Sequence, residues 1–94
     1  MIRSIDDKET ESVWSGLRSR KLPTDIQQTA RRKLRQLNRV TEPRQLAVPR
    51  GNCLEELKGN RKGTYSIRIN DQWRITFRWR DGDAHDVRIE DYHS

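Results

Sequence analysis

The 94-residue chain has 20 lysine and arginine residues against 14 aspartate and glutamate residues, so its net charge is +6 and its pI is near 10.1. Only 31% of the residues are hydrophobic, and no run of them approaches the roughly 20 apolar residues that cross a membrane. This composition excludes a membrane-spanning protein and favours a polyanion, such as nucleic acid, as the binding partner.

The length and the cysteine content limit the architecture further. A single domain over residues 1–94 is expected, because this length is typical of one domain and no Ser/Gly-rich linker interrupts the sequence. Cys53 is the single cysteine, so a disulfide within the chain and a zinc site built from several thiolates are excluded. Because the first residues also lack the apolar run of a signal peptide, a cytoplasmic location is expected.

The N-terminal part predicts one short strand and one helix. Residues 2–5 favour a strand, and Asp6 followed three positions later by Glu9 has the form of a helix N-cap with a reciprocal partner. The helix is expected to end near Gly16, since glycine tolerates the left-handed backbone with which many helices end. The side chains expected to point inward are Val13, Trp14 and Leu17.

The second helix is the best-marked element and is predicted over residues 24–39. Pro23 precedes it, and Gln27 sits at the capping-box position. Apolar residues recur at helical spacing at Ile26, Ala30, Leu34 and Leu37. Basic residues occupy the other faces, at Arg31, Arg32, Lys33, Arg35 and Arg39. These basic residues form either a solvated face or a face turned toward RNA.

After a loop framed by Pro43 and Pro49, apolar and polar residues alternate with a period of two, which is typical of half-buried strands. The strands are predicted between residues 54 and 57, over 65–70, over 73–80 and over 86–93, with hairpin turns at 70–72 and 81–83. The alternation assigns Trp73 and Trp79 to the core. The order of elements predicts an α+β fold, with two N-terminal helices packed on a mainly antiparallel sheet of four to five strands.

The same alternation predicts a basic row on one sheet face, at Arg68, Arg74 and Arg78. Cleavage of RNA by its own 2′-hydroxyl requires a base, an acid and cations that stabilise charge on the phosphorane. The chain ends with residues that suit these roles. His93 is the natural acid or base, Asp91 either orients it or takes part in proton transfer, and Tyr92 donates a hydrogen bond or stacks on a base. Lys58 and Arg74 are candidates for phosphate charge.

Structural alternatives exist for each of these candidates. His93 could be a solvated tail residue, Tyr92 could cover the core, and the arginines could form surface ion pairs worth about 0–1 kcal/mol. The glycine-flanked segment 59–63 lacks the spacing and the following helix of a phosphate-binding loop, so a basic hairpin loop is expected.

Three short motifs are specific in combination: Leu-Lys-Gly at 57–59, Trp-Arg-Ile at 73–75 and the terminal Asp-Tyr-His at 91–93. Together with segments 49–52, 60–63, 66–68 and 70–72, they resemble the HigB-type toxins of the RelE superfamily, often called plasmid maintenance system killer proteins. The resemblance covers almost the whole chain. It implies a RelE-like fold.

The resemblance further implies a toxin of a type II toxin–antitoxin system that cleaves messenger RNA in the ribosomal A site and arrests growth. The implied partner is a HigA-type antitoxin, which is a helix-turn-helix protein. The toxin is expected to contact DNA only through this antitoxin. No metal or other cofactor is expected. By position, the resemblance assigns catalysis to Lys58, Arg74, Asp91, Tyr92 and His93. It assigns RNA contacts to Arg61, Lys62, Arg68 and Arg78.

One departure bears on the mechanism. Where some relatives have a histidine shortly before the Leu-Lys-Gly motif, this chain has Glu55, so an acid/base pair of two histidines is in question. Two other functions stay open on the sequence. They are a catalytically silent RNA- or ribosome-binding module on the same fold and a partner-binding or regulatory subunit.

Overall fold

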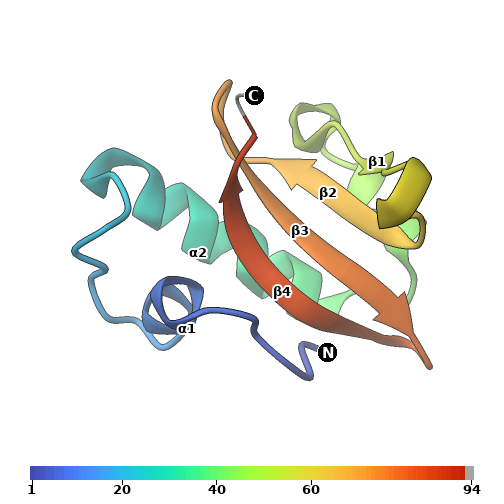
Figure 1. The fold of residues 1–94 in the computed structure, drawn as a ribbon, viewed down its shortest axis with the longest axis horizontal. Helices are drawn as coiled ribbons and strands as arrows, with labels where there is room; N and C mark the ends of the chain where they lie inside the picture. The colour runs from blue at the N-terminus through green and yellow to red at the C-terminus, as the bar shows by residue number, and fades with distance from the viewer. Residues whose placement is uncertain (93–94) are drawn as a thin grey trace.

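Two helices pack on a four-stranded antiparallel sheet in the computed structural model, which describes residues 1–92 (Figure 1). The helices are α1 (Lys8–Trp14) and α2 (Thr24–Arg39). The strands are β1 (Glu55–Glu56), β2 (Thr64–Arg68), β3 (Trp73–Arg80) and β4 (Asp83–Asp91). Short 3-10 helices in the connections are η1 (Pro43–Ala47), η2 (Arg50–Asn52) and η3 (Gly59–Arg61). The predicted α+β class is confirmed, and so are the bounds of the second helix.

The sheet is a meander in which spatial order follows chain order, β1-β2-β3-β4. Both predicted hairpin turns are present. Between β2 and β3, the Asn70 side-chain oxygen accepts hydrogen bonds from the backbone N–H groups of Gln72 (2.9 Å) and Trp73 (2.8 Å), which is how asparagine stabilises a tight turn. Between β3 and β4, Asp81 and Gly82 both have positive φ angles, 54° and 80°, as twisted two-residue hairpins require.

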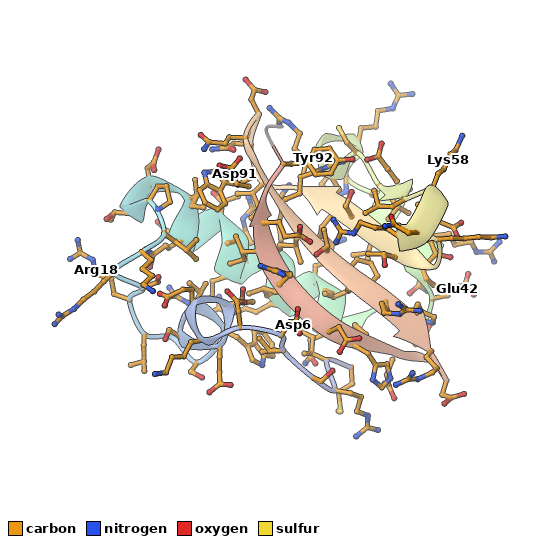
Figure 2. All side chains as sticks on the ribbon, in the orientation of Figure 1. Asp6, Arg18, Glu42, Lys58, Asp91 and Tyr92 are labelled. Atoms are coloured by element: carbon orange, nitrogen blue, oxygen red, sulfur yellow. The ribbon has the colours of Figure 1, made fainter. Side chains whose placement is uncertain are left out.

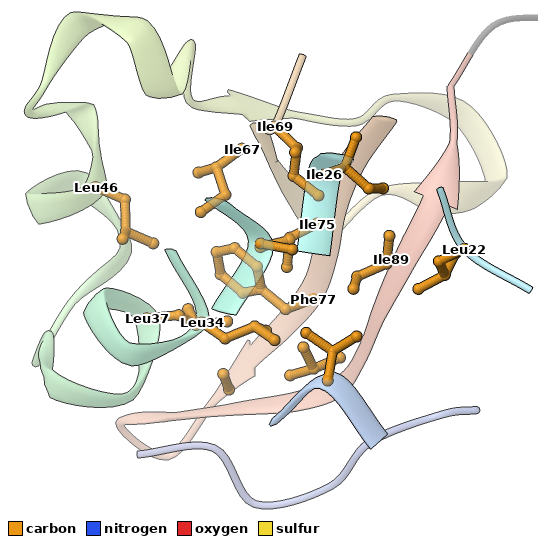
Figure 3. Packing of buried hydrophobic residues seen from close by; sticks show 14 residues of the cluster. Leu22, Ile26, Leu34, Leu37, Leu46, Ile67, Ile69, Ile75, Phe77 and Ile89 are labelled. Carbon is orange, nitrogen blue, oxygen red and sulfur yellow. The ribbon is translucent and has the colours of Figure 1, made fainter. Parts of the chain in front are cut away.

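The hydrophobic core lies between α2 and the sheet, and Phe77 is at its centre (Figure 3). The Phe77 ring is fully buried and stacks on Tyr65 at 5.8 Å between ring centroids, with the edge of Trp79 at 6.3 Å. Buried residues from the helix and the strands surround it, namely Ile26, Ala30, Leu34, Leu37, Ile67, Ile75, Val87 and Ile89. Fully burying one such large side chain contributes about 1.5–3 kcal/mol. These positions, read from both periodicities, are therefore confirmed as core, whereas Trp73 and Trp79, which were also assigned to the core, are half-buried and pack against it.

The predicted strand over residues 2–5 is wrong as a continuous element. The segment instead makes two separate parallel bridges to β4, one from Ile2 to Ala84 and one from Ile5 to Val87. Between these two contact points β4 is irregular, because Asp86 has a φ of 52° and the register with β3 shifts there. An extra residue of this kind interrupts a ladder. The strand β4 also begins at Asp83, three residues before the predicted start, and ends at Asp91.

The predicted cap of the first helix is also corrected. The N-cap is Asp7 and makes no side-chain capping bond, while the Glu9 carboxylate accepts a hydrogen bond from the Ser19 hydroxyl at 2.5 Å. The helix ends at Trp14, and the chain turns at Gly16 with a φ of 86°, near the predicted stop. Leu17 therefore lies beyond the helix and is 62% exposed, so the prediction that it points inward is wrong.

Two polar residues of α2 have roles that their spacing did not predict. Gln27 makes no capping bond and instead holds the α1–α2 connection, by accepting from the Ser19 N–H and donating to the carbonyls of Ser19 and Leu22, each at 2.9 Å. Lys33 is buried and donates to the backbone carbonyl of Arg68. Burial lowers the pKa of the Lys33 ammonium, and neighbouring arginines lower it further. Among residues 1–92, no helix is long and apolar enough to span a membrane.

Candidate functional site

The predicted basic row lies on the sheet face opposite the core. Arg68 and Arg74 are cross-strand partners on β2 and β3, and Arg78 pairs with Thr64 four residue pairs farther along. Since alternate residues of a strand point to opposite faces, these side chains lie opposite the buried Ile75 and Phe77. We call this surface the polar face of the sheet.

Arg74 is the most enclosed charge on the polar face, with 7% of its surface exposed. One guanidinium nitrogen, Nη1, donates to Glu55 Oε1 at 3.2 Å, and Nη2 donates to the carbonyl of Cys53 at 2.7 Å. The guanidinium carbon lies 5.1 Å from the centroid of the Tyr92 ring, within range of a cation–π interaction. The Nε atom is buried and has no hydrogen-bond partner among residues 1–92. Arg74 is thus fixed in place by its two guanidinium ends.

Tyr92 completes this cluster from the end of β4. Its hydroxyl donates to the same Glu55 Oε1 at 2.6 Å, and its backbone N–H donates to the carbonyl of Gln72 at 2.6 Å. The hydrogen bond from Tyr92 lowers the pKa of the Glu55 carboxyl, and Arg74 lowers it further. The same bond to Glu55 raises the pKa of the Tyr92 phenol. Both directions agree, so at neutral pH the group is an ionised carboxylate held by a neutral phenol and a guanidinium.

A second cluster on the polar face is centred on Glu90. Both of its oxygens accept from the Arg61 guanidinium, at 3.2 and 2.7 Å, and Thr76 also donates to it. Burial acts to raise the pKa of Glu90, but the hydrogen bonds from Arg61 and Thr76 outweigh burial, so the pKa is lowered. The forked pair fixes η3, which carries Arg61, over the sheet.

A hollow of about 210 Å³ adjoins the second cluster. Its lining includes Arg61, Arg78, Arg88, Asp6 and Asp86. Arg88 lies 3.6 Å from the Asp6 carboxylate, whereas Arg78 has no ion-pair partner among residues 1–92. The hollow therefore presents three arginines, one of which is unpaired within that part of the chain.

The structure joins some of the sequence-predicted site residues and separates others. Arg74 and Tyr92 are in contact, whereas Lys58 is exposed at the N-cap of η3 and its side chain extends away from Tyr92 in Figure 2. Asp91 pairs with Trp73 and accepts a hydrogen bond from Gln72 at 3.0 Å, so by alternation it leaves β4 on the face opposite Arg74. His93 lies outside the described residues.

The predicted RNA contacts also differ in their surroundings. Arg61 is tied to Glu90, and Arg68 forms an exposed ion pair with Asp71. Lys62 is exposed at the C-cap of η3, beside Arg61. Arg61 and Arg78 share the hollow described above.

Sequence reasoning did not include Glu55 and Glu90 in the site. Alternation along β4 could have found Glu90, because it is the direct partner of Arg74 on β3. Glu55 was visible as a departure from a family pattern, but no local signal joined it to Arg74 and Tyr92. That contact depends on the pairing of β1 with β2, in which Glu55 lies opposite Ser66.

Comparison with known proteins identifies the family. Residues 5–93 match the family described as the RelE-like toxin of type II toxin–antitoxin system HigB. The chain is 39% identical over 85 residues to Toxin HigB-1 of Vibrio cholerae serotype O1, covering 89% of this chain and 90% of that protein. It is 50% identical over 40 residues to Endoribonuclease HigB of Proteus vulgaris, covering 43% of this chain and 44% of that protein. The resemblance read from the motifs is confirmed, and the chain belongs to the HigB-like family of RelE-like toxins of type II toxin–antitoxin systems.

Proposed function

We propose that this toxin is an endoribonuclease that cleaves messenger RNA in the ribosomal A site and thereby arrests translation and growth. The observation that carries the proposal is the cluster of Arg74, Glu55 and Tyr92 on the polar face of the sheet. The name of the Proteus vulgaris relative, Endoribonuclease HigB, supports the same activity. Membership of the family itself gives the protein an antitoxin as partner.

Arg74 is the proposed cation for the scissile phosphate. Its guanidinium is held at both ends, so it needs little reorganisation when charge develops on the phosphorane, and such preorganised donors contribute much of the rate in charge-developing reactions. Lys58, from the loop that follows β1, is the proposed second cation.

The last residues of the sequence are proposed to transfer protons and to position a nucleobase. His93 acts as acid or base near neutral pH, and Asp91 orients it or takes part in proton transfer. Tyr92, with 41% of its surface exposed, is suited to stack on a nucleobase while its hydroxyl stays on Glu55. The reaction is proposed to need no metal ion, since a base, an acid and cations suffice for attack by the 2′-hydroxyl.

The RNA backbone is proposed to follow the basic residues of the polar face, with contacts to Arg61, Lys62, Arg68 and Arg78. The hollow beside Arg78 is of a size and charge that suit a phosphate group. Lys62 is exposed and Arg68 is half-buried, so both can reach a passing RNA strand.

Dependence on the ribosome follows from the small number of groups in the cluster. Message that is already held in a reactive geometry needs less from the enzyme, because orientation alone can supply several kcal/mol of the barrier, on the order of 7–11. Since translating ribosomes are the substrate, the proposal includes a cytoplasmic location. The antitoxin is proposed to be of the HigA type, a helix-turn-helix protein through which the complex contacts its own operator.

The test is induced expression with mapping of messenger 5′ ends, with and without translation. New ends within translated codons that disappear when translation is blocked would support the proposal. Arg74→Ala is expected to lower cleavage at least 100-fold, the usual scale for loss of one transition-state donor. The matched control is Arg35→Ala, which removes the same charge from the exposed face of α2.

Other outcomes would change the assignment. Cuts that persist without translation would argue against the A-site mechanism. Ribosome binding without any new 5′ ends would favour the catalytically silent binding module.

A further inference from the structure

The loop between β1 and β2 is attached to the sheet by one charged pair. This segment, residues 58–63, carries η3, and we call it the η3 loop. A hydrogen bond from the Leu57 N–H to the Thr64 carbonyl, at 2.8 Å, closes its base. Among residues 1–92, the side chains of the loop make one hydrogen-bonded contact to the sheet, the fork from Arg61 to Glu90. The position of the loop over the polar face therefore depends on that pair.

Other support for the η3 loop is weak. Residues 58–62 are exposed, and strand β1, which leads into the loop, is two residues long. Gly59 and Gly63 bend the chain near the two ends of the loop, with φ angles of 70° and 91° that glycine adopts without strain. A segment with few buried apolar contacts opens at a low cost in free energy. An anchor is therefore needed to hold the loop in one position.

Glu90 is suited to be this anchor. It lies on β4 directly opposite Arg74 of β3, and its side chain is 18% exposed. Its two oxygens accept from two guanidinium nitrogens of Arg61, at 3.2 and 2.7 Å, while Thr76 donates to the same carboxylate from the sheet. Forked pairs of this kind are stronger and more specific in geometry than neutral hydrogen bonds. The carboxylate is thus fixed by the sheet and holds the loop.

The charges around Glu90 also favour this role. A carboxylate among the arginines of the polar face would by itself oppose an approaching phosphate. Its pairing with Arg61 offsets that charge. The loop held in this way carries two further cations, Lys58 at the N-cap of η3 and Lys62 at its C-cap. One negative charge on the sheet therefore fixes a loop with three positive charges.

We propose that Glu90 is a positioning residue for RNA cleavage, an inference that rests on the endoribonuclease function proposed above. By holding Arg61, it fixes the η3 loop over the polar face. The lysines of the loop, Lys58 and Lys62, are then held at a set place relative to Arg74. The stem of a lysine is long and flexible, so a fixed backbone limits the region that its ammonium reaches. A cation placed in advance needs less reorganisation when charge develops on the phosphate.

The first test is Glu90→Gln in the full chain, assayed by single-turnover cleavage of message with the toxin in excess over programmed ribosomes. The amide keeps the shape of the side chain but loses the charged fork. The rate is expected to fall about 10-fold, because a displaced cation loses part of its stabilisation of the transition state. The matched control is Glu56→Gln on β1, which removes the same charge from an exposed position and is expected to cleave at the wild-type rate. Circular dichroism and antitoxin binding check that the variants fold.

Combined substitutions test whether Glu90 acts through the loop. Lys58→Ala alone is expected to lower the rate about 100-fold. If Glu90 positions Lys58, adding Glu90→Gln to that variant lowers the rate no further, whereas independent effects would multiply to about 1000-fold. Adding Glu90→Gln to Arg61→Ala is likewise expected to have no effect, since the anchor is already lost. A residue that only stabilises the fold, or that acts directly on Arg74, would show its full effect in both backgrounds.

The outcomes separate the possible failures. Glu90→Gln cleaving within twofold of wild type would overturn the positioning role, as would a Glu90→Gln loss that persists in either the Lys58→Ala or the Arg61→Ala background. A loss confined to the otherwise wild-type chain, with fold and antitoxin binding retained, would support the role. Wild-type protein that cuts no message would instead overturn the proposed function itself.

Discussion

The two faces of the same three strands differ in what holds them together. On the core face, Ile67, Ile75 and Phe77 pack against α2 and are fully buried. On the polar face, Arg74 directly precedes Ile75 on β3 and is held by Glu55. Its cross-strand partner, Glu90, is held by Arg61. The core face tolerates exchange of partners, because apolar packing is non-directional. The polar face depends on particular donors and acceptors, and it is the face that we propose to meet RNA.

The largest expected effect is a difference in stability between substitutions on the two faces of the sheet. Phe77→Ala should destabilise the protein by about 3–5 kcal/mol, because it opens a cavity at the centre of the core. Arg74→Ala, three residues earlier on β3, should cost only about 1 kcal/mol, since Glu55 is half-exposed and regains water. Chemical denaturation of both variants measures this difference. Equal losses of stability would mean that the polar face is as important to folding as the core.

A smaller effect should appear in the pH dependence of folding. The folded pKa of Glu90 is lowered, so its contribution to stability is present above the ordinary glutamate pKa of about 4.3 and is lost as pH falls through the folded value. Glu90→Gln should therefore flatten the decline in the free energy of unfolding between about pH 5 and pH 3. Denaturation across this range is the measurement, with Glu56→Gln as control. An unchanged slope would show that the Arg61–Glu90 pair contributes little in solution.

The smallest expected effect concerns a residue that belongs to neither face. Leu17→Ala should change the free energy of unfolding by no more than about 0.5 kcal/mol, because Leu17 is 62% exposed. Leu34→Ala, the same substitution in the core, should cost about 2–5 kcal/mol. Thermal or chemical denaturation compares the two. A loss of several kcal/mol at Leu17 would indicate that it packs inward after all.

Much of the fold could be predicted from short-range pattern. The bounds of α2 followed from apolar residues three and four positions apart, and the two hairpins followed from turn residues between alternating strands. These features depend on neighbours within a few residues. The bulge at Asp86 and the burial of Lys33 could not be read in this way, because each depends on an element packed against it from elsewhere in the chain.

In the candidate site, too, some features follow from the sequence pattern and others depend on tertiary contacts. The sequence alone determined the residue types, the basic row on one sheet face and the family, because these depend on identity and on a period of two. Only the tertiary structure decided that Glu55 meets Arg74, 19 residues away, and Tyr92, 37 residues away. It likewise turned Asp91 and Lys58 away from that cluster. The physical reason is register: strand pairing and side-chain alternation choose which distant groups share a hydrogen bond, and no local preference specifies that choice.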